Sequence, residues 1–473
     1  MKSSIKMEAL GKDGCRRIHK EGLSILENVG MRVDDPELRK ALQKNGAKTD
    51  ANDRVRLPKE MVQKALETVN RKPIFKCING KELHIYGDNQ YCGALTNDPW
   101  IIDVEKGPRP PCLEDIKRHA RLADALPLVS IVTRMDYPCT DLPEKEANLR
   151  TLEALVSNTS KALFCAPSSM ESAQMWVDIA EIMAGGSLHK NQILGAYVAT
   201  VSPLVMSLED SRMLRFLAEK GVIMRGGGCP LSGGTSPFTL AGTMACAEAE
   251  MLFFLTAVQA LSPGAPCIYT VGGYVMDMAS GIYSTAGVEG LLLGIAYAEM
   301  AHFHQLPTLG TMATSNVPHY DFQNGAEAAL AGFISFFGEK NVLYGLGSLA
   351  NACGMSAEQV VMHHDLVEIF QRIGKGIDFS HQEEALKSIE QTGPGGNFLT
   401  DDLTIKLLRT DEHFAGKSFV VANPGPVKET MVANAHRRVE EILANHKPAV
   451  DQEKIKRVRD YVSGKLGKCP WAL

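Results

Sequence analysis

The chain has 473 residues, 45% hydrophobic and 22% charged, with a formal net charge of −5 and a pI near 6.3. This composition is typical of a folded globular protein and gives no overall basic field for nucleic acid or anionic membranes. The N-terminal residues lack the apolar run of a secretory signal, and no segment approaches the roughly 18 apolar residues of a membrane span. The eleven cysteines include no C-x-x-C pair, which indicates reduced thiols. We therefore expect a cytoplasmic protein without a nucleic-acid or membrane partner.

Three helices are predicted at the start of the chain. The first covers residues 13–29, the second begins with Pro36 behind an aspartate cap, and the third covers 58–70. Short alternating β segments follow over residues 74–104. We interpret residues 1–110 as an N-terminal helical and β elaboration packed on the main domain.

After residue 110 the pattern changes to alternating strands and helices. Seven short apolar runs read as buried strands: LVSIVTR, KALFCAP, ILGAYVAT, VIMRGG, PCIYTVGGY, LPTLGTM and NVLYGLG. Helical patterns separate the later runs at residues 208–220, 241–261, 288–306 and 326–340. Buried strands joined by helices form a parallel sheet, and this many units predict a (β/α)8 TIM-type barrel.

The eighth strand of this barrel has two candidate positions. One is a short segment near residues 377–380, and the other is the region that precedes Leu113. We assign residues 111–426 to the barrel as its catalytic domain, and residues 427–473 to a charged C-terminal helical tail packed on the outside. Three glycine-rich or polar turns, GGGCPLSGGTSP, VGGYVMDMASG and GLGSLANACG, follow predicted strands and therefore cluster at the C-terminal face, where barrel active sites lie.

These loops resemble the trimethylamine methyltransferase family, and in particular its branch without pyrrolysine, which acts on glycine betaine and related quaternary amines. The segments that carry the resemblance are LSGGTSPFTLAGTMACAEAEMLFFLTAVQALSPGAPCIY, YVMDMASG, NVLYGLGSLANACGMSAEQVVM, GPGGNFL and IIDVEKGPRPPCLEDIKRHARLADAL. The resemblance covers residues 8–410. It departs from the family pattern at Asn397, where histidine is common, and at Ala279 and Ser280, where an Arg-Thr pair is frequent. It departs again at Ala350 and His363, where the family often has acidic residues.

The resemblance implies transfer of a methyl group from a quaternary amine to the Co(I) corrinoid of a separate corrinoid protein. A quaternary nitrogen leaves without protonation and the nucleophile belongs to the cofactor, so the barrel supplies binding, orientation and dehydration of the cation. The resemblance also implies a homo-oligomer. The histidines at 302 and 304, and those at 363 and 364, do not share a helix face, so we expect no tightly bound metal.

A betaine site needs aromatic faces for the ammonium group and donors for the carboxylate. Aromatic rings near the predicted loops are Tyr91, Trp100, Tyr137, Tyr197 and Tyr274. Two arginines at the ends of predicted strands could bind the carboxylate, with two further donors and two other polar residues in the substrate site: Arg134, Arg225, Asn97, Thr235, Asp277 and His363. Gly233 and Gly234 would allow the corrinoid to approach. Each residue also has an ordinary explanation in core packing, loop bracing or ion pairs between loops.

Three other functions remain open from the sequence. The same reaction could act on proline betaine, carnitine or γ-butyrobetaine, which the sequence does not separate from glycine betaine. A lyase or aldolase on the same barrel would need a catalytic lysine or a carboxylate-rich metal site. The lysines between Lys190 and Lys340 fall on predicted helices, which disfavours that alternative. A betaine-binding protein without transfer activity is the third, favoured by the departures at Ala279, Ala350 and Asn397.

Overall fold

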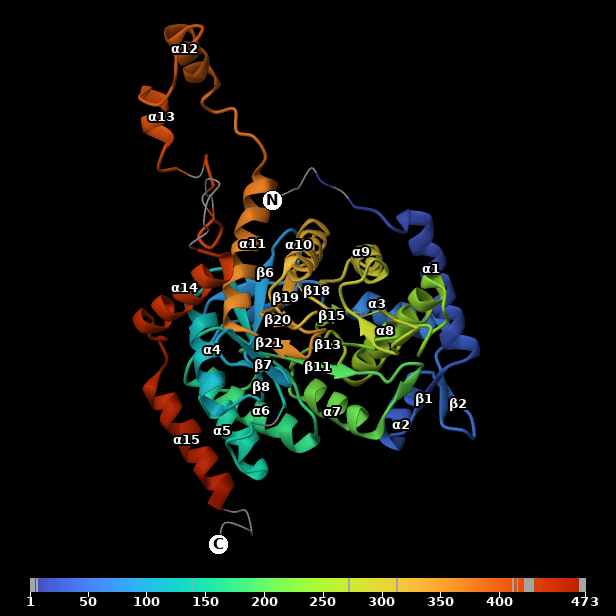
Figure 1. The fold of residues 1–473 in the computed structure, drawn as a ribbon. Coiled ribbons are helices and arrows are strands. Elements are labelled where there is room, and N and C mark those ends of the chain that lie inside the picture. Colours follow the sequence, from blue (N-terminus) through green and yellow to red (C-terminus); the bar gives the residue numbers. More distant parts are fainter. Residues whose placement is uncertain are drawn as a thin grey trace.

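Eight parallel strands form a closed barrel at the centre of the molecule in the computed structural model (Figure 1). The structure describes residues 5, 7–137, 139–270, 273–311, 314–410, 412–414, 416–420 and 429–467. In order around the barrel the strands are β6 (Tyr91–Leu95), β9 (Val129–Met135), β10 (Ala162–Ala166), β11 (Leu194–Ala199), β13 (Ile223–Gly227), β15 (Cys267–Tyr269), β18 (Leu309–Thr311) and β19 (Val342–Leu346). A parallel bridge between Tyr269 and Thr308 joins β15 to β18, and β19 pairs with β6, which closes the ring.

The predicted barrel is confirmed, and all seven sequence-predicted strands lie in it. The eighth strand is β6, so the barrel is completed from the region before Leu113. The other candidate, residues 377–380, is wrong because that segment is exposed and lies outside the sheet. Since β6 falls within residues 1–110, the barrel begins before the boundary that the sequence suggested. The boundary between residues 426 and 427 lies outside the described residues.

Eight helices surround the barrel, each following one strand (Figure 1). They are α4 (Leu113–Ala125), α5 (Glu144–Val156), α6 (Met170–Ala184), α7 (Leu208–Glu219), α8 (Leu240–Leu261), α9 (Val288–Phe303), α10 (Phe322–Phe337) and α11 (Ala357–Lys375). Helix α8 is long and apolar enough to cross a membrane, yet 89% of its apolar window is buried. It contacts α1 (Gly11–Asn28), α3 (Lys59–Thr68) and α7, so it is a core helix covered on its outer side by the N-terminal segment.

The N-terminal segment forms the predicted helices and also a small sheet that the sequence did not reveal. Helix α2 (Pro36–Lys44) is capped by Asp35, whose side chain accepts a hydrogen bond from the Glu37 amide at 3.2 Å. Strands β1 (Met31–Val33), β2 (Lys48–Thr49), β3 (Arg54–Arg56) and β12 (Val205–Met206) pair in the order β12-β1-β3-β2. Strand β12 belongs to the loop after β11, so this sheet ties the N-terminal segment to the barrel.

A hairpin closes the lower, N-terminal end of the barrel. Strands β4 (Ile74–Lys76) and β5 (Glu82–His84) carry Phe75, Leu83 and Ile85 into one buried cluster with residues of the barrel interior, including Ile131, Phe164 and Ile223. The Lys76 amide donates to the Gln192 carbonyl at 2.8 Å, and this contact fixes the hairpin just before β11. The lower end is therefore filled by apolar side chains, and the polar residues of the interior lie above them.

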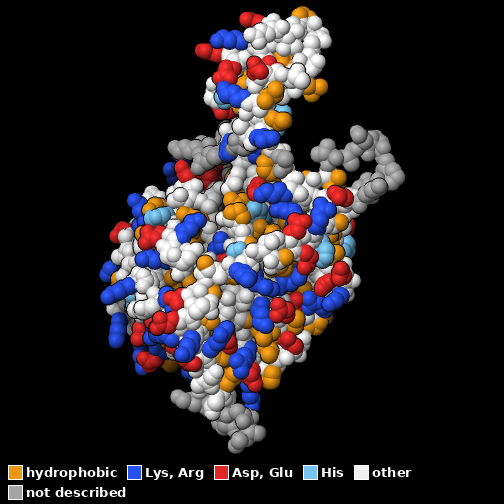
Figure 2. Space-filling model, turned by 90° about the vertical axis from the view of Figure 1, so that its left-hand side faces the viewer, with side chains coloured by type: hydrophobic (Ala, Val, Ile, Leu, Met, Phe, Trp, Pro, Cys, Tyr) orange, Lys and Arg blue, Asp and Glu red, His pale blue; other side chains and the backbone are white. Residues whose placement is uncertain are grey.

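The C-terminal region divides into an arm and a tail. Helices α12 (Gln382–Thr392) and α13 (Asp402–Leu407) project from the end of α11 away from the barrel, and Figure 2 shows hydrophobic side chains on this projection. Helices α14 (Met431–Asn445) and α15 (Gln452–Gly467) instead pack on α4, α5, α6 and α11. The expected helical tail on the outside of the barrel is confirmed.

Candidate active site

A cavity of about 220 Å³ opens at the C-terminal end of the barrel. Its walls combine rings, small residues and three charged side chains. The lining residues from the strand ends and loops are Leu95, Asp98, Met135, Tyr137, Tyr197, Arg225, Gly228, Cys229, Thr270, Gly273, Tyr274, Leu309, Gly310, Thr311, Thr314, Tyr344, Gly345, Ser348 and Ala352. Residues from around α9 and α10 extend it to one side: Thr285, Gly290, Leu291, Gly294, Tyr297, Ala331, Ile334, Ser335 and Lys340. This position is the usual one for an active site in a barrel.

Arg225 occupies the centre of the cavity floor. It lies on β13, where it pairs in register with Tyr197 on β11, so both side chains point into the barrel. Its guanidinium carbon lies 4.5 Å from the ring centre of Tyr197, 4.7 Å from that of Tyr344 and 5.1 Å from that of Phe164. Arg225 is 8% exposed and makes no ion pair or hydrogen bond with any described residue, and its Nε is buried without a partner. Aromatic faces hold the cation while its N–H groups stay available to a ligand.

The phenols around Arg225 are neutral groups. Burial raises the pKa of Tyr344 and of Tyr274 to about 12, and it raises that of Tyr197 well above the usual range. The hydroxyl of Tyr197 donates to the Gly227 carbonyl at 3.1 Å, so its orientation is fixed. These tyrosines therefore present ring faces and hydroxyl donors at neutral pH, and they do not exchange protons there.

Asp98 is the acidic residue of the cavity wall. It follows β6, is 3% exposed, and its Oδ2 has no hydrogen-bond partner among the described residues. Burial raises the pKa of this carboxyl well above its usual range. An ionised carboxylate in this position would need a cation beside it. The cavity thus holds one unpaired carboxyl and, on its floor, one unpaired guanidinium.

The loop that carries Asp98 is held from three sides. The Thr96 amide and hydroxyl both donate to the Thr133 carbonyl at 2.9 Å, and the Asn97 side chain bonds to the backbone of Met135 at 2.9 and 3.1 Å. On α4, His119 Nδ1 bonds to the Thr96 carbonyl at 2.9 Å. The loop therefore follows the positions of β9 and α4.

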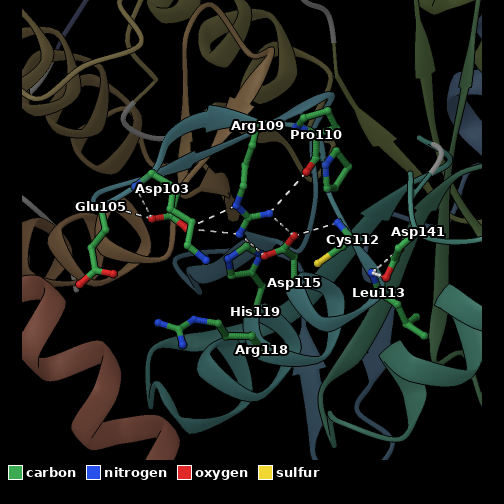
Figure 3. Close-up of polar contacts among 12 residues, drawn as sticks. Asp103, Glu105, Arg109, Pro110, Cys112, Leu113, Asp115, Arg118, His119 and Asp141 are labelled. Carbon is green, nitrogen blue, oxygen red and sulfur yellow. Dashed lines mark hydrogen bonds and ion pairs between the residues drawn. The ribbon is translucent and has the colours of Figure 1, made fainter.

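Helix α4 is itself fixed by an ion-pair network, shown in Figure 3. Arg109, at the end of β8 (Gly107–Arg109), contacts Asp115 with both terminal nitrogens at 2.7 Å and also bonds to Asp103 on β7 (Trp100–Asp103). Asp115 in turn accepts from the Cys112 amide at 2.8 Å. Although burial acts in the opposite direction, the Arg109 hydrogen bonds lower the pKa of Asp115 to about 2. The β7–β8 hairpin and the start of α4 thus support the Asp98 loop from outside.

A left-handed turn borders the cavity after β20 (Ser348–Leu349). Ala350, Asn351 and Ala352 have φ angles of 52°, 60° and 59°, a conformation that costs a non-glycine residue roughly 1–2 kcal/mol. The Asn351 side chain holds the turn, because its Oδ1 accepts from the Thr285 amide at 3.0 Å and its amide donates to the Tyr283 carbonyl. Ala352 lines the cavity. The turn therefore fixes the wall beside β19 at the expense of backbone strain.

Four of the sequence-predicted site residues line the cavity together: Tyr137, Tyr197, Arg225 and Tyr274. The ring of Tyr197 contacts Arg225, so one of its faces is occupied by a protein cation. Tyr274 stands beside Tyr283, with ring centres 5.9 Å apart. Burial, followed by the nearby Asp98, raises the pKa of Tyr137. Tyr137 and Tyr274 are therefore the predicted rings that remain for a ligand ammonium group.

Other predicted residues are placed away from the cavity. Arg134 on β9 is fully buried, and its guanidinium bonds to Asp136 at 2.7 Å and to Asn148 at 2.8 Å. Tyr91 begins β6 at the lower end of the barrel, where its hydroxyl accepts from the His84 amide at 3.0 Å. Trp100 lies on β7 and is 47% exposed, outside the cavity. These placements match ion pairing and packing, the ordinary explanations that the sequence also allowed.

The remaining predicted residues act on loops, and none of them lines the cavity. Thr235 accepts from the Leu231 amide at 2.9 Å within its own turn, and Asp277 accepts from the Ser280 hydroxyl at 2.7 Å. His363 on α11 is buried and bonds to the Gly347 amide at 3.2 Å, and burial lowers its pKa to about 3. It braces the loop after β19 as a neutral ring.

Two predicted glycines and two departures from the family pattern also lie outside the cavity. Gly233, with φ 85°, and Gly234 form a turn at the rim, where a Cβ at 233 would lie 2.9 Å from the Met278 sulfur. Ala279 is exposed in the Asp277 turn, and Asn397 lies exposed on the projecting arm. Neither departure therefore contacts the described cavity wall.

Sequence reasoning missed three of the cavity's most informative residues, Asp98, Tyr344 and Lys340. Asp98 follows β6, whose sequence YCGAL was predicted to be a short β segment but was not assigned to a place in the barrel. Tyr344 lies in a predicted strand, and alternation along NVLYGLG places it on the same face as Val342, which faces the barrel interior. Lys340 was assigned to a helix, yet it follows the end of α10.

The fold is a TIM barrel, and the cavity at its C-terminal end is lined by an unpaired guanidinium, Arg225, and an unpaired carboxyl, Asp98. The described lining contains no histidine, no serine–histidine pair and no cluster of metal ligands.

Comparison with known proteins identifies the family. The profile of the trimethylamine methyltransferase family matches residues 1–470, and the chain belongs to this family. The glycine betaine methyltransferase of Desulfitobacterium hafniense strain Y51 is 28% identical over 458 residues, 95% of each chain. The trimethylamine methyltransferase of Methanosarcina barkeri strain Fusaro is 25% identical over 471 residues, covering 94% of this chain and 92% of that one. The expected family and its methyltransferase activity are confirmed.

A solved structure agrees with this assignment at the level of the fold. The monomethylamine methyltransferase of Methanosarcina barkeri superposes with a TM-score of 0.52 at 12% identity, covering 98% of this chain and 88% of that one. A likeness at this identity concerns the barrel architecture alone.

Proposed function

We propose that this methyltransferase takes a methyl group from a betaine, with glycine betaine as the first candidate, and transfers it to the Co(I) corrinoid of a partner protein. The observation that carries the proposal is that one ring-lined cavity contains both an unpartnered guanidinium, Arg225, and an unpartnered carboxyl, Asp98. A betaine carries a carboxylate and a quaternary ammonium, the two charges that complement this pair. The similarity to a glycine betaine methyltransferase supports the same substrate class.

Each end of the substrate has a partner in this arrangement. Arg225 binds the carboxylate through its N–H groups, while Tyr197, Tyr344 and Phe164 hold the guanidinium plane in place. Asp98 pairs with the ammonium group, and the rings of Tyr137 and Tyr274 provide further favourable surface for the cation. The bound betaine is thereby fixed at both ends, which restricts the direction of its N–CH3 bonds.

The reaction requires no general acid or base from these residues. The C–N bond breaks, its electron pair stays on nitrogen, and a tertiary amine leaves without proton transfer. The attraction between Asp98 and nitrogen weakens as the positive charge is lost, so Asp98 favours the bound substrate over the transition state. Its contribution is to affinity and orientation, and the cavity wall excludes water from the cation.

The rim of the cavity suits an approaching partner. Four exposed apolar side chains lie in the loops after β13 and β15 and at the start of α10: Phe238, Met278, Ile282 and Phe322. The rim turn at Gly233 lies against Phe238 and Met278, and an added Cβ there would lie only 2.9 Å from the Met278 sulfur and 3.0 Å from the Phe238 ring. A corrinoid, when bound here, supplies the nucleophile that accepts the methyl group. Gly233, Gly234 and the apolar rim would hold it over the cavity.

The test is an anaerobic spectroscopic assay of Co(I) corrinoid with the purified chain and a panel of amines. The panel contains trimethylamine, glycine betaine, proline betaine, carnitine and γ-butyrobetaine, first with free cobalamin and then with the cognate corrinoid protein. We expect loss of the Co(I) absorption band with betaines and not with trimethylamine, which lacks a carboxylate. An unchanged Co(I) spectrum with every amine and both corrinoids would contradict transfer, and betaine binding without transfer would then identify a binding protein.

The proposal includes association between copies of this chain. The projecting arm exposes large apolar side chains, among them Ile377, Phe379, Leu399 and Leu408, at 72–82% of their full accessible surface. Apolar surface of this kind usually meets a partner. Light scattering coupled to size-exclusion chromatography should give a multiple of 51.4 kDa. A monomer at micromolar concentration would contradict this part of the proposal.

A further inference from the structure

Lys340 is a buried cation that the proposed reaction does not use. It lies between α10 and β19 and is 4% exposed, and its side-chain amine makes no ion pair or hydrogen bond with any residue that the structure describes. Burial lowers the pKa of its amine to about 8, so it is still mainly protonated at neutral pH. Lysine is rarely buried without a partner, because removing an ammonium from water is costly.

The side chain of Lys340 is directed inward by two glycines. It crosses Gly310 on β18, where an added Cβ would lie only 1.9 Å from Lys340 Cδ and 2.7 Å from Nζ. A Cβ on Gly294 of α9 would lie 3.7 Å from the same Nζ. Any larger residue at 310 would collide with the lysine stem. The amine therefore lies between β18 and α9, facing the cavity and not the outer surface.

The space around this amine is a side chamber of the cavity. Its walls come from β18, α9 and α10, and small residues recur one turn apart on both helices, with Gly290 and Gly294 on α9 and Ala331 and Ser335 on α10. Such residues leave room that larger side chains would fill. Asp98 is the acidic residue of the whole described lining, and it belongs to the loop after β6. The chamber itself thus presents a cation without a counter-charge.

We propose that the side chamber is a second anion subsite, in which the Lys340 ammonium binds a carboxylate. The cavity then holds two cations, Arg225 and Lys340, against one carboxyl, Asp98, and a short betaine satisfies the first cation and the carboxyl but not the lysine. Two sources supply the missing carboxylate. One is the carboxylate end of a longer betaine whose ammonium lies near Asp98. This first possibility rests on the proposed function. The other is a small free carboxylate bound beside the substrate.

The experiment is calorimetric binding to the full chain at pH 7 of glycine betaine, of γ-butyrobetaine, and of acetate in the presence of saturating glycine betaine, which occupies Arg225 so that acetate reports on Lys340. The variants are Lys340→Met, which keeps the length of the side chain, and Lys190→Met, which removes an exposed lysine as the matched control. If the subsite binds a small free carboxylate, Lys340→Met should weaken acetate binding at least tenfold. If the subsite binds the carboxylate of a longer betaine, Lys340→Met should weaken γ-butyrobetaine binding by the same factor and leave the affinity for glycine betaine unchanged. Lys190→Met should match the wild type in both cases.

Two outcomes would overturn the subsite. The first is that acetate and γ-butyrobetaine either fail to bind the wild type or bind Lys340→Met equally well. The second is a lower thermal unfolding temperature for Lys340→Met, since loss of a truly unpartnered buried ammonium should leave that temperature unchanged or raise it. Failure of the proposed function is separable, because acetate binding involves no methyl transfer and the Co(I) assay with glycine betaine does not depend on Lys340.

Discussion

Two buried arginines lie in two differently built regions of the same barrel. Arg134 on β9 points to the layer between the barrel and its helices, where Asp136 and Asn148 bind its guanidinium. Arg225 on β13 points into the barrel, where rings surround its plane and no described acceptor meets its N–H groups. Both are arginines of barrel strands, Arg134 next to the end of β9 and Arg225 in the middle of β13. The difference shows that the hydrogen-bond partners, and not the residue type, separate a scaffold cation from a binding one.

The largest expected effect is the loss of stability when Arg134, the scaffold arginine, is replaced. We expect Arg134→Met to lower the free energy of unfolding by about 3 kcal/mol, because Asp136 would be left buried beside an apolar side chain. Denaturant titration followed by circular dichroism measures the change. Betaine affinity of the folded variant should equal that of the wild type. A stable variant with weaker betaine binding would place Arg134 in the site after all.

The opposite result is expected for Arg225. Arg225→Met should weaken glycine betaine binding at least thirtyfold, about 2 kcal/mol, because the carboxylate loses its charged donor. The unfolding temperature should stay constant or rise, since no described protein group depends on this guanidinium. Titration calorimetry and differential scanning calorimetry of one preparation test both points. Equal betaine affinity in variant and wild type would remove Arg225 from the site.

The pH dependence of betaine affinity tests the role of Asp98 beside Arg225. Burial raises its pKa in the free protein, so below that raised pKa a cationic ligand must displace a proton in order to bind. Betaine affinity should therefore increase with pH and level off once the carboxyl is ionised. Asp98→Asn should abolish this slope and raise KM about tenfold at the plateau, and kcat should stay equal or rise, because Asp98 favours the bound substrate over the transition state. A variant that loses kcat while keeping KM would assign Asp98 a role in the transfer step.

The smallest effect concerns the ring that orients Arg225. Tyr197→Leu removes one cation–π contact, worth about 1 kcal/mol, so the betaine Kd should rise about fivefold. Tyr91→Leu is the matched control, because this ring packs at the closed lower end. Titration calorimetry measures the betaine Kd of Tyr197→Leu and of Tyr91→Leu, and the two values are compared with that of the wild type. A larger loss from Tyr91→Leu would contradict the separation of the two ends.

The sequence predicted the barrel because its strands are buried on both faces and read as continuous apolar runs, as VSIVTRM in β9 does. Strand β6 was predicted as a β segment, but YCGAL is short and contains glycine, so its place in the barrel stayed open and the loop with Asp98 was not assigned to the site. Within the site, residue type and strand end identified Arg225 but equally selected Arg134. Which face a strand-end residue occupies depends on register, and which partners it meets depends on residues far away in the chain, such as Asn148 and Tyr344.

The hairpin of β4 and β5 fills the lower end of the barrel. Substrate and product therefore reach and leave Arg225 and Asp98 through the cavity mouth at the other end. A protein seated on the rim would block that route. The amine must then enter before the partner docks, and the demethylated product must wait until the partner departs. Steady-state kinetics would follow a compulsory order, and excess partner protein would slow turnover by occupying the entrance of the empty enzyme.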